Sequence, residues 1–235
     1  MEDRLTFVNS SSPRIATLQD LQKIPTGENG EVLVEANVFD RSIICEHIQR
    51  DMEGFTGEKV FVREGLARRL AVVNTFLQER DSKYRLRVVY GYRHPIVQEK
   101  YFSEMRQIVA KEHPELDENE IISLTHNFIA VPEVAGHPTG GAVDATISVS
   151  DGDLDMGTDI SDFSRVDTIK TFAKGISPEA LSNRLLLRDA MVSAGLAPFY
   201  GEWWHFCFGD REWAFFYRKP SSLYSPVRYR ITSEQ

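Results

Sequence analysis

Three stretches of the chain carry apolar residues at helical spacing. Residues 63–80 have apolar positions at steps of four and three, the stripe of an amphipathic helix. These positions are Leu66, Leu70, Val73 and Leu77. A second helix is predicted after Pro95, whose fixed φ suits a first helical turn, and it ends near residues 113–114. A third is predicted to begin at Ser177 and to stop at Gly195.

Four other stretches have the character of strands. Residues 85–92 are β-branched and aromatic, and residues 142–149 alternate apolar and polar side chains. The alternation predicts a half-buried strand with Asp144 on its polar face. Two aromatic-rich runs, residues 202–208 and 212–217, are separated by Gly209-Asp210-Arg211, which favours a hairpin.

The remaining segments predict how these elements are organised. Residues 151–164 are polar and interrupted by glycine, so we expect a long surface loop. The turn-rich first thirty residues predict an N-terminal arm, residues 1–30, ahead of one domain, residues 31–235. We expect an α+β single domain with a mostly antiparallel central sheet flanked by helices.

Charge and composition exclude several classes of partner. The chain has 27 Lys and Arg against 35 Asp and Glu, and its formal net charge of -8 repels nucleic-acid phosphates and anionic lipid surfaces. No stretch of about 18 apolar residues predicts a membrane span, and the acidic start does not resemble a signal peptide. Cys45 and Cys207 lie too far apart in sequence to indicate a disulfide framework or a thiolate metal site. We therefore expect a cytoplasmic protein with no nucleic-acid or membrane partner.

Two of the six histidines stand beside residues that bind metals. His137 precedes Asp144 in Gly136-His137-Pro138-Thr139-Gly140-Gly141-Ala142-Val143-Asp144, and His205 ends the run Glu202-Trp203-Trp204-His205. A catalytic zinc ion takes three imidazole or carboxylate ligands and leaves a fourth position for water. Two histidines and one aspartate would complete this set, with the zinc site on the sheet.

The spacing of these residues needs a turn. His137 and Asp144 are seven apart, which would place them on opposite faces of an uninterrupted strand. The Gly140-Gly141 pair permits a sharp turn, so that His137 can fold back over the face that carries Asp144. Glu202 and His205 are three residues apart, again an odd number that would place them on opposite faces of a strand. A Glu in the turn or bulge before the strand would bring both side chains to the same face.

Two further residues suit peptide hydrolysis. A metal-bound water needs a group that accepts its proton and later delivers it to the leaving amine, and Glu202 fits that role. Arg93, at the end of a predicted strand, can stabilise the oxyanion of a tetrahedral intermediate. Each residue also has a purely structural alternative. His137 can be a turn or core residue, the Trp203-Trp204 pair can fill a core, and Arg93 can pair with a surface carboxylate.

The order of the motifs resembles one known family. Four motifs follow one another in the order Tyr92-Arg93, His137-x-x-Gly140-x-Ala142-x-Asp144, Asp155-Met156-Gly157-Thr158 and Glu202-Trp203-Trp204-His205. This order resembles that of the zinc D-Ala-D-Ala dipeptidases of the vancomycin-resistance type. An earlier segment, Phe55-Thr56-Gly57, also resembles that family. The resemblance covers residues from about 38 to 218. It implies one Zn²⁺ per chain held by His137, Asp144 and His205, with Glu202 as general base and acid and Arg93 as the group that stabilises the transition state. It also implies a small closed cavity that favours dipeptides over longer peptides.

Three positions depart from the family pattern. Ala135 stands where the family commonly has Ser, which removes a hydroxyl available to substrate. The family's Phe-Asp pair, whose Asp holds the substrate ammonium, falls on Ile160-Ser161, so we expect the neighbouring Asp162 to take that role beside Ser161. His94 stands between Arg93 and Pro95, where many relatives have Arg-Pro directly.

These residues predict zinc-dependent hydrolysis of D-alanyl-D-alanine, or a closely related D-amino-acid dipeptide, to free amino acids. One alternative is a D,D- or L,D-carboxypeptidase acting on peptidoglycan stem peptides, which the expected cytoplasmic location disfavours. A second is a catalytically inactive zinc-binding module, which has no need of Glu202 and Arg93.

Overall fold

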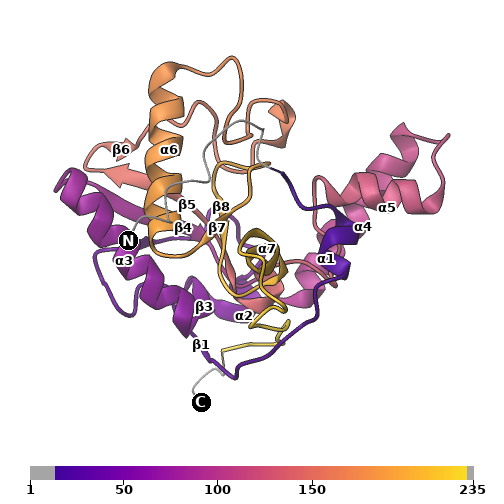
Figure 1. Cartoon of the computed structure of the whole chain (residues 1–235), viewed down its shortest axis with the longest axis horizontal. Coiled ribbons are helices and arrows are strands. Elements are labelled where there is room, and N and C mark those ends of the chain that lie inside the picture. The colour runs from indigo at the N-terminus through magenta and orange to yellow at the C-terminus, as the bar shows by residue number, and fades with distance from the viewer. Residues whose placement is uncertain (1–13, 232–235) are drawn as a thin grey trace.

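The computed structural model describes residues 14–231 and has one six-stranded sheet, one two-stranded sheet and seven helices within that range (Figure 1). The helices are α1 (Leu18–Gln22), α2 (Glu53–Thr56), α3 (Glu64–Arg80), α4 (Pro95–Glu112), α5 (Glu118–His126), α6 (Pro178–Ser193) and α7 (Arg211–Phe216). The strands are β1 (Leu33–Glu35), β2 (Ile44–Cys45), β3 (Phe61–Arg63), β4 (Arg85–Tyr90), β5 (Ala142–Val149), β6 (Gly152–Asp153), β7 (Ala197–Pro198) and β8 (His205–Cys207). The α+β fold class is as predicted.

The larger sheet has the order β2-β4-β5-β8-β7, and β6 pairs with β5 outside this path. Only β2 and β4 run parallel among these described pairs, so the sheet is mostly antiparallel, as predicted. Strand β5 is the longest and pairs with β4 on one side and β8 on the other. Residues of β4, β5 and β8 can therefore meet at the centre of one sheet face.

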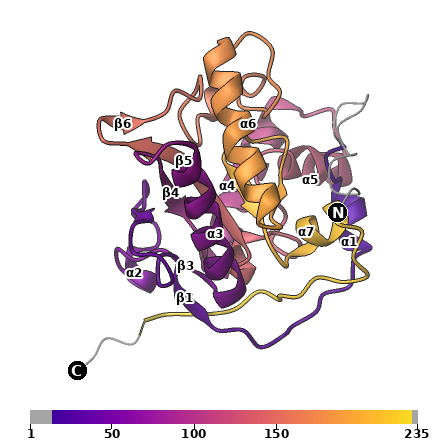
Figure 2. The same ribbon diagram turned by 60° about the vertical axis from the view of Figure 1, so that its left-hand side comes forward.

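Helices α3 and α6 pack together against one face of this sheet (Figure 2). The four apolar positions that predicted α3 are fully buried. Their neighbours include Leu187 and Met191 of α6 and Val143 and Ala145 of β5. Burying these side chains is the main force that fixes the two helices on the sheet, because apolar area removed from water stabilises by roughly 25 cal/mol per Å².

Strand β5 differs from its prediction in one respect. Seven of its eight residues are buried, so the prediction of a half-buried strand is wrong. The apolar side chains face α3 and α6, whereas Asp144 and Thr146 lie on the opposite face and are only 5% and 1% exposed. The polar face is buried because the His137 turn and the segment after β6 cover it. Alternation predicts which side chains share a face, but it cannot tell whether water or protein covers that face.

The predicted hairpin over residues 202–217 is also wrong. The first run supplies β8, but the second forms helix α7. Asp210 caps α7 by accepting a hydrogen bond from the Trp213 backbone N–H at 2.8 Å, which stabilises a helix start. Strand β8 pairs instead with β5 and β7. Short aromatic runs suit both helix and strand, so the capping residue decided the outcome.

Helix α5 is not among the elements that the hydrophobic pattern predicts. Its signal is a capping box, in which Asp117 and Glu120 satisfy each other's backbone N–H groups. The expected loop over residues 151–164 is mostly irregular, with the short strand β6 near its start. A 3₁₀ turn (Phe163–Arg165) follows where that loop was expected to end.

The predicted N-terminal arm lies partly outside the described residues, since residues 1–13 are not described. In the described part, Leu21 of α1 is fully buried, and residues 25–29 run alongside residues 222–223 (Figure 2). Arg63 joins both segments to the domain, because its guanidinium pairs with Glu28 at 2.8 Å and donates to the Ser225 carbonyl at 3.0 Å. The boundary at residue 30 stays a prediction.

Cys45 and Cys207 are both free thiols. Within residues 14–231, no helix is both long enough and apolar enough to span a membrane.

Candidate active site

The structure brings His137, Asp144 and His205 together at the centre of the sheet. Their ligand atoms all lie within 4.8 Å of one another. His137 Nε2 is 3.5 Å from Asp144 Oδ2, and His205 Nδ1 is 3.0 Å from Asp144 Oδ1. Asp144 on β5 and His205 on β8 are direct cross-strand partners, so the ladder itself sets their separation.

The turn that carries His137 forms as the glycine pair predicted. His137 begins a 3₁₀ turn (His137–Thr139), and its carbonyl accepts a hydrogen bond from the Gly140 N–H at 3.0 Å. Gly140 has φ of 72°, in the left-handed region that glycine adopts without a steric penalty. The chain then enters β5 at Ala142, which leaves His137 folded back over the face of Asp144.

Hydrogen bonding orients the His137 ring. His137 Nδ1 lies 2.7 Å from the Gly91 carbonyl, to which an N–H can donate, so the lone pair of Nε2 faces Asp144. Burial lowers the pKa of His137, which favours the neutral ring that can bind a metal. Burial would raise the pKa of Asp144, but the two histidines hold it below its usual range, and this carboxyl stays ionised. Two imidazole nitrogens and a carboxylate oxygen converge, and this donor set fits zinc.

Glu202 lies beside this cluster in the turn before β8, as the parity argument required. The chain between Glu202 and β8 is irregular, and the Glu202 backbone carbonyl accepts a hydrogen bond from the His205 N–H at 3.4 Å. Burial raises the pKa of Glu202 to about 7, with neighbouring Asp144 and Glu212 adding to the effect. A carboxyl group with this pKa can both accept and release a proton near neutrality.

Arg93 lies within the electrostatic reach of the same cluster. It follows β4, and its backbone N–H donates to the His137 carbonyl at 3.1 Å. Burial alone would lower the pKa of Arg93, but Tyr90, Asp144 and Asp51 outweigh burial and raise it, so the guanidinium remains charged. Its buried Nε has no hydrogen-bond partner among the described residues. Arg93 therefore keeps a donor available for a negative group.

Residues that the sequence did not single out hold Arg93 in place. Its guanidinium carbon lies 4.5 Å from the centre of the Tyr90 ring and 5.3 Å from that of Tyr101. Arg93 also donates to Gln98 Oε1 at 3.0 Å, and both tyrosine hydroxyls donate to Asp51. Tyr90 faces Asp144 across a register shift in β4. Local bulges of this kind re-aim side chains beside active sites, but nothing in the sequence marks their position.

Two of the positions that depart from the family pattern, His94 and Ala135, are buried. His94 caps α4 by accepting a hydrogen bond from the Ile96 N–H at 3.2 Å, and its ring stacks on Phe55 at 4.2 Å between centroids. Ala135 is buried two residues before His137.

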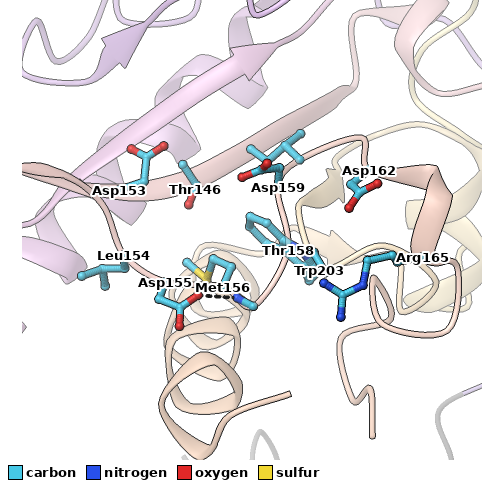
Figure 3. A pocket seen from close by; sticks show the side chains of 12 residues that line it. Thr146, Asp153, Leu154, Asp155, Met156, Thr158, Asp159, Asp162, Arg165 and Trp203 are labelled. Carbon is cyan, nitrogen blue, oxygen red and sulfur yellow. Dashed lines mark hydrogen bonds between the residues drawn. The ribbon is translucent and has the colours of Figure 1, made fainter. Parts of the chain in front are cut away.

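A cavity of about 460 Å³ is lined by Thr146 of β5, by residues 153–160, and by Asp162, Arg165 and Trp203 (Figure 3). Asp162 lines it, but Ser161 does not. Thr146 also lines it, and its buried hydroxyl has no hydrogen-bond partner within the described chain. Thr146 is two residues beyond Asp144 on the same strand face, but none of the three converging residues lines the cavity.

The Asp162 carboxylate is partly engaged by its own turn. Its Oδ1 accepts hydrogen bonds from the backbone N–H and the hydroxyl of Ser164. Ser161 has φ of 63°, which is uncommon for a residue other than glycine. This backbone conformation lies next to Asp162, in the loop that borders the cavity (Figure 3).

The fold and this arrangement define a protein with a candidate metal centre on a mostly antiparallel sheet. Residues 40–223 match the model of the D-Ala-D-Ala dipeptidase family of peptidases, and because the match covers more than half of the chain, the protein belongs to that family.

Two known proteins are similar to this chain. A D-alanyl-D-alanine dipeptidase of Synechocystis sp. is 27% identical, and the match covers 88% of this chain and 93% of that protein. Among solved structures, a mutant of the vancomycin-resistance D,D-pentapeptidase VanY in complex with Zn(II) has a TM-score of 0.41 and 14% identity, and the match covers 86% of this chain and 96% of that one.

Proposed function

We propose that this protein is a zinc-dependent dipeptidase that hydrolyses D-alanyl-D-alanine, or a closely related D-amino-acid dipeptide, to free amino acids. The observation that carries the proposal is the convergence of His137, Asp144 and His205 within 4.8 Å. Membership of the D-Ala-D-Ala dipeptidase family supports the choice of substrate. The free thiols of Cys45 and Cys207 suit a reducing compartment, and the proposal places the enzyme in the cytoplasm.

One zinc ion per chain would be held by His137 Nε2, the Asp144 carboxylate and His205 Nδ1. These are the atoms that face one another in the cluster. Zinc bound by three such ligands polarises a carbonyl group and makes water a nucleophile at neutral pH.

Glu202 moves the proton during the reaction. Its carboxylate accepts a proton from the attacking water as the new carbon–oxygen bond forms. It then delivers that proton to the amine nitrogen as the carbon–nitrogen bond breaks. The pKa of about 7 that burial gives Glu202 allows both transfers near neutral pH.

Arg93 stabilises the negative charge that develops on the carbonyl oxygen. Its unpartnered Nε and its rigid planar cation suit an oxygen anion. The contacts with Tyr90, Tyr101 and Gln98 hold the group in place before substrate arrives, so little reorganisation is needed.

The substrate ammonium is held at the cavity beside β5. Asp162 supplies the negative charge, Ser161 shapes the loop next to it, and Thr146 offers an unused hydroxyl. A dipeptide that reaches from the metal ligands toward Asp162 would place its amino end in this cavity.

The experiment that tests the proposal measures free alanine released by zinc-loaded protein. The substrates are D-Ala-D-Ala, L-Ala-L-Ala and a tripeptide that ends in D-Ala-D-Ala. We expect turnover of the D,D dipeptide alone. Cleavage of the tripeptide would instead indicate a carboxypeptidase, and zinc binding without turnover of any peptide would indicate a binding module.

The role of Glu202 is tested by Glu202→Ala. The variant is expected to bind zinc like the wild type but to lose about 10²- to 10⁴-fold in kcat, the range for removal of a general acid–base group. Glu179→Ala is the matched control, because Glu179 is an exposed carboxylate far along the chain from the cluster. Turnover preserved in Glu202→Ala would contradict the assignment.

A further inference from the structure

The outer nitrogen of the His205 ring has buried contacts of its own. His205 Nε2 lies 3.4 Å from Cys207 Sγ and 3.8 Å from Glu212 Oε2. Cys207 Sγ lies 3.3 Å from the same Glu212 oxygen. These contacts lie on the side of the ring opposite to Asp144, which faces Nδ1.

Strand and helix geometry set this arrangement. His205 and Cys207 are two residues apart on β8 and share one face. Glu212 is in the first turn of α7, whose start is fixed by the buried Asp210 cap. Cys207 is fully buried and the Glu212 side chain is 18% exposed, so water competes little for these contacts.

The hydrogen-bonding capacity of each group allows one consistent pattern. A neutral imidazole carries one N–H and one lone pair. When Nδ1 presents its lone pair toward the metal ligands, Nε2 carries the N–H and donates it to the sulfur of Cys207. The Cys207 thiol in turn donates its own hydrogen to Glu212 Oε2. Every hydrogen in this chain of three groups then has an acceptor.

We propose that Cys207 and Glu212 are positioning residues that fix the tautomer and orientation of His205, so that its Nδ1 binds the metal. The inference rests on the proposed role of His205 as a zinc ligand. A histidine ligand commonly donates its second ring N–H to a carboxylate or carbonyl group, and losing that partner costs metal affinity. Here the thiol relays the contact, because Glu212 is too far from Nε2 for a direct hydrogen bond.

The same three groups offer a competing arrangement that the test must separate. His205, Cys207 and Glu212 also have ligand atoms within 4.8 Å of one another and can hold a metal through Nε2 and the sulfur. Metal ions in both sites at once would bind Nδ1 and Nε2 of the same His205 ring, which would have to lose both of its N–H protons. The approach of His137 to Asp144 at 3.5 Å completes the Nδ1 site and favours it.

The first measurement is the zinc dissociation constant, obtained by competition with a chromogenic chelator. Glu212→Leu and Cys207→Ala are expected to weaken zinc binding about 10- to 100-fold. Cys207→Ser and Glu212→Gln retain hydrogen-bonding groups and are expected to restore most of the affinity. Glu179→Leu is the control, because Glu179 is in the first turn of α6 as Glu212 is in that of α7. Wild-type affinity in both Glu212→Leu and Cys207→Ala would overturn the proposal.

The second measurement is the absorption spectrum of the cobalt(II)-substituted protein. The proposal predicts no thiolate-to-cobalt charge-transfer band in the wild type, together with altered d–d bands in Cys207→Ala. A charge-transfer band that disappears in Cys207→Ser would show that sulfur binds the metal and would overturn the proposal. If Glu212→Leu fails to fold by circular dichroism, the Cys207→Ala and Cys207→Ser pair decides. Neither measurement uses a substrate, so both remain informative if D-Ala-D-Ala is not cleaved.

Discussion

Replacing Arg93 with Met separates the proposed catalytic role of the guanidinium from its structural role. Methionine keeps an unbranched apolar stem but removes the charge and all N–H donors. The change deletes the contacts with the Tyr90 and Tyr101 rings at 4.5 and 5.3 Å and the hydrogen bond to Gln98 at 3.0 Å. It also deletes the unpartnered Nε that is proposed to face the oxyanion.

The expected loss of stability is small, whereas the expected loss of catalytic rate is large. Two cation–π contacts at about 0.5–1 kcal/mol each and one hydrogen bond at about 1 kcal/mol give a stability loss of about 2–3 kcal/mol. For a chain of this size, each 1 kcal/mol lowers Tm by about 2–4 °C, so Tm should fall by about 4–12 °C. A protein of ordinary stability, about 5–15 kcal/mol, stays almost fully folded at 25 °C after this loss. Loss of an oxyanion donor, in contrast, lowers kcat about 10²- to 10³-fold.

The assay measures kcat and KM for D-Ala-D-Ala, with zinc content and Tm determined on the same samples. We expect Arg93→Met to lose mostly kcat at 25 °C, and Arg93→Lys to recover only part of it, because an ammonium lacks the planar fork of donors. Arg106→Met is the control, since Arg106 is an exposed residue of α4. A folded, zinc-loaded Arg93→Met variant with wild-type kcat would refute the role in the transition state.

Three further outcomes are expected. Gly140→Ala places Ala at φ of 72°, which by itself costs about 1–2 kcal/mol, and its Cβ would also clash with the Leu33 side chain. The variant should therefore also weaken zinc binding by shifting His137. Gly175→Ala, with φ of 84° and open space around it, should lower Tm without affecting zinc. Asp162→Asn should raise KM for an unblocked dipeptide more than it lowers kcat, and an unchanged KM would exclude the ammonium contact. Burial opposes ionisation of Glu28, but hydrogen bonds from Ser225, Gly30 and Arg63 lower its pKa to about 2 from 4.5. The contribution of the ionised Glu28 carboxylate to stability is therefore complete above pH 4.5 and is lost as the pH falls toward 2. Because this carboxylate is 38% exposed, Glu28→Gln should lower the free energy of unfolding by only about 1 kcal/mol at neutral pH, and the difference in Tm from the wild type should vanish as the pH falls through that range.

The long elements of the fold could be predicted because each carries a repeated local signal. Helix α3 and strands β4 and β5 begin and end within two residues of the predicted bounds. Short elements failed because their signal is brief. The aromatic run after Gly209 became α7 through the Asp210 cap, and α5 depends on the capping box of Asp117 and Glu120.

The sequence by itself indicated the residues that are proposed to hold a metal and move a proton. Glycines at 140 and 141 allow His137 to turn back toward Asp144, and the run from Glu202 to His205 puts an acid in the turn before a strand. These are local constraints, since steric limits on the backbone act within a few residues.

Only the tertiary structure decided what surrounds those residues. Three features depend on contacts between different elements of the fold. They are the packing of Tyr90 and Tyr101 on Arg93, the burial of both faces of β5, and the contacts of Cys207 and Glu212 with His205. Such contacts depend on strand order and on the register between strands, and a shift of one residue would send each side chain to the opposite face.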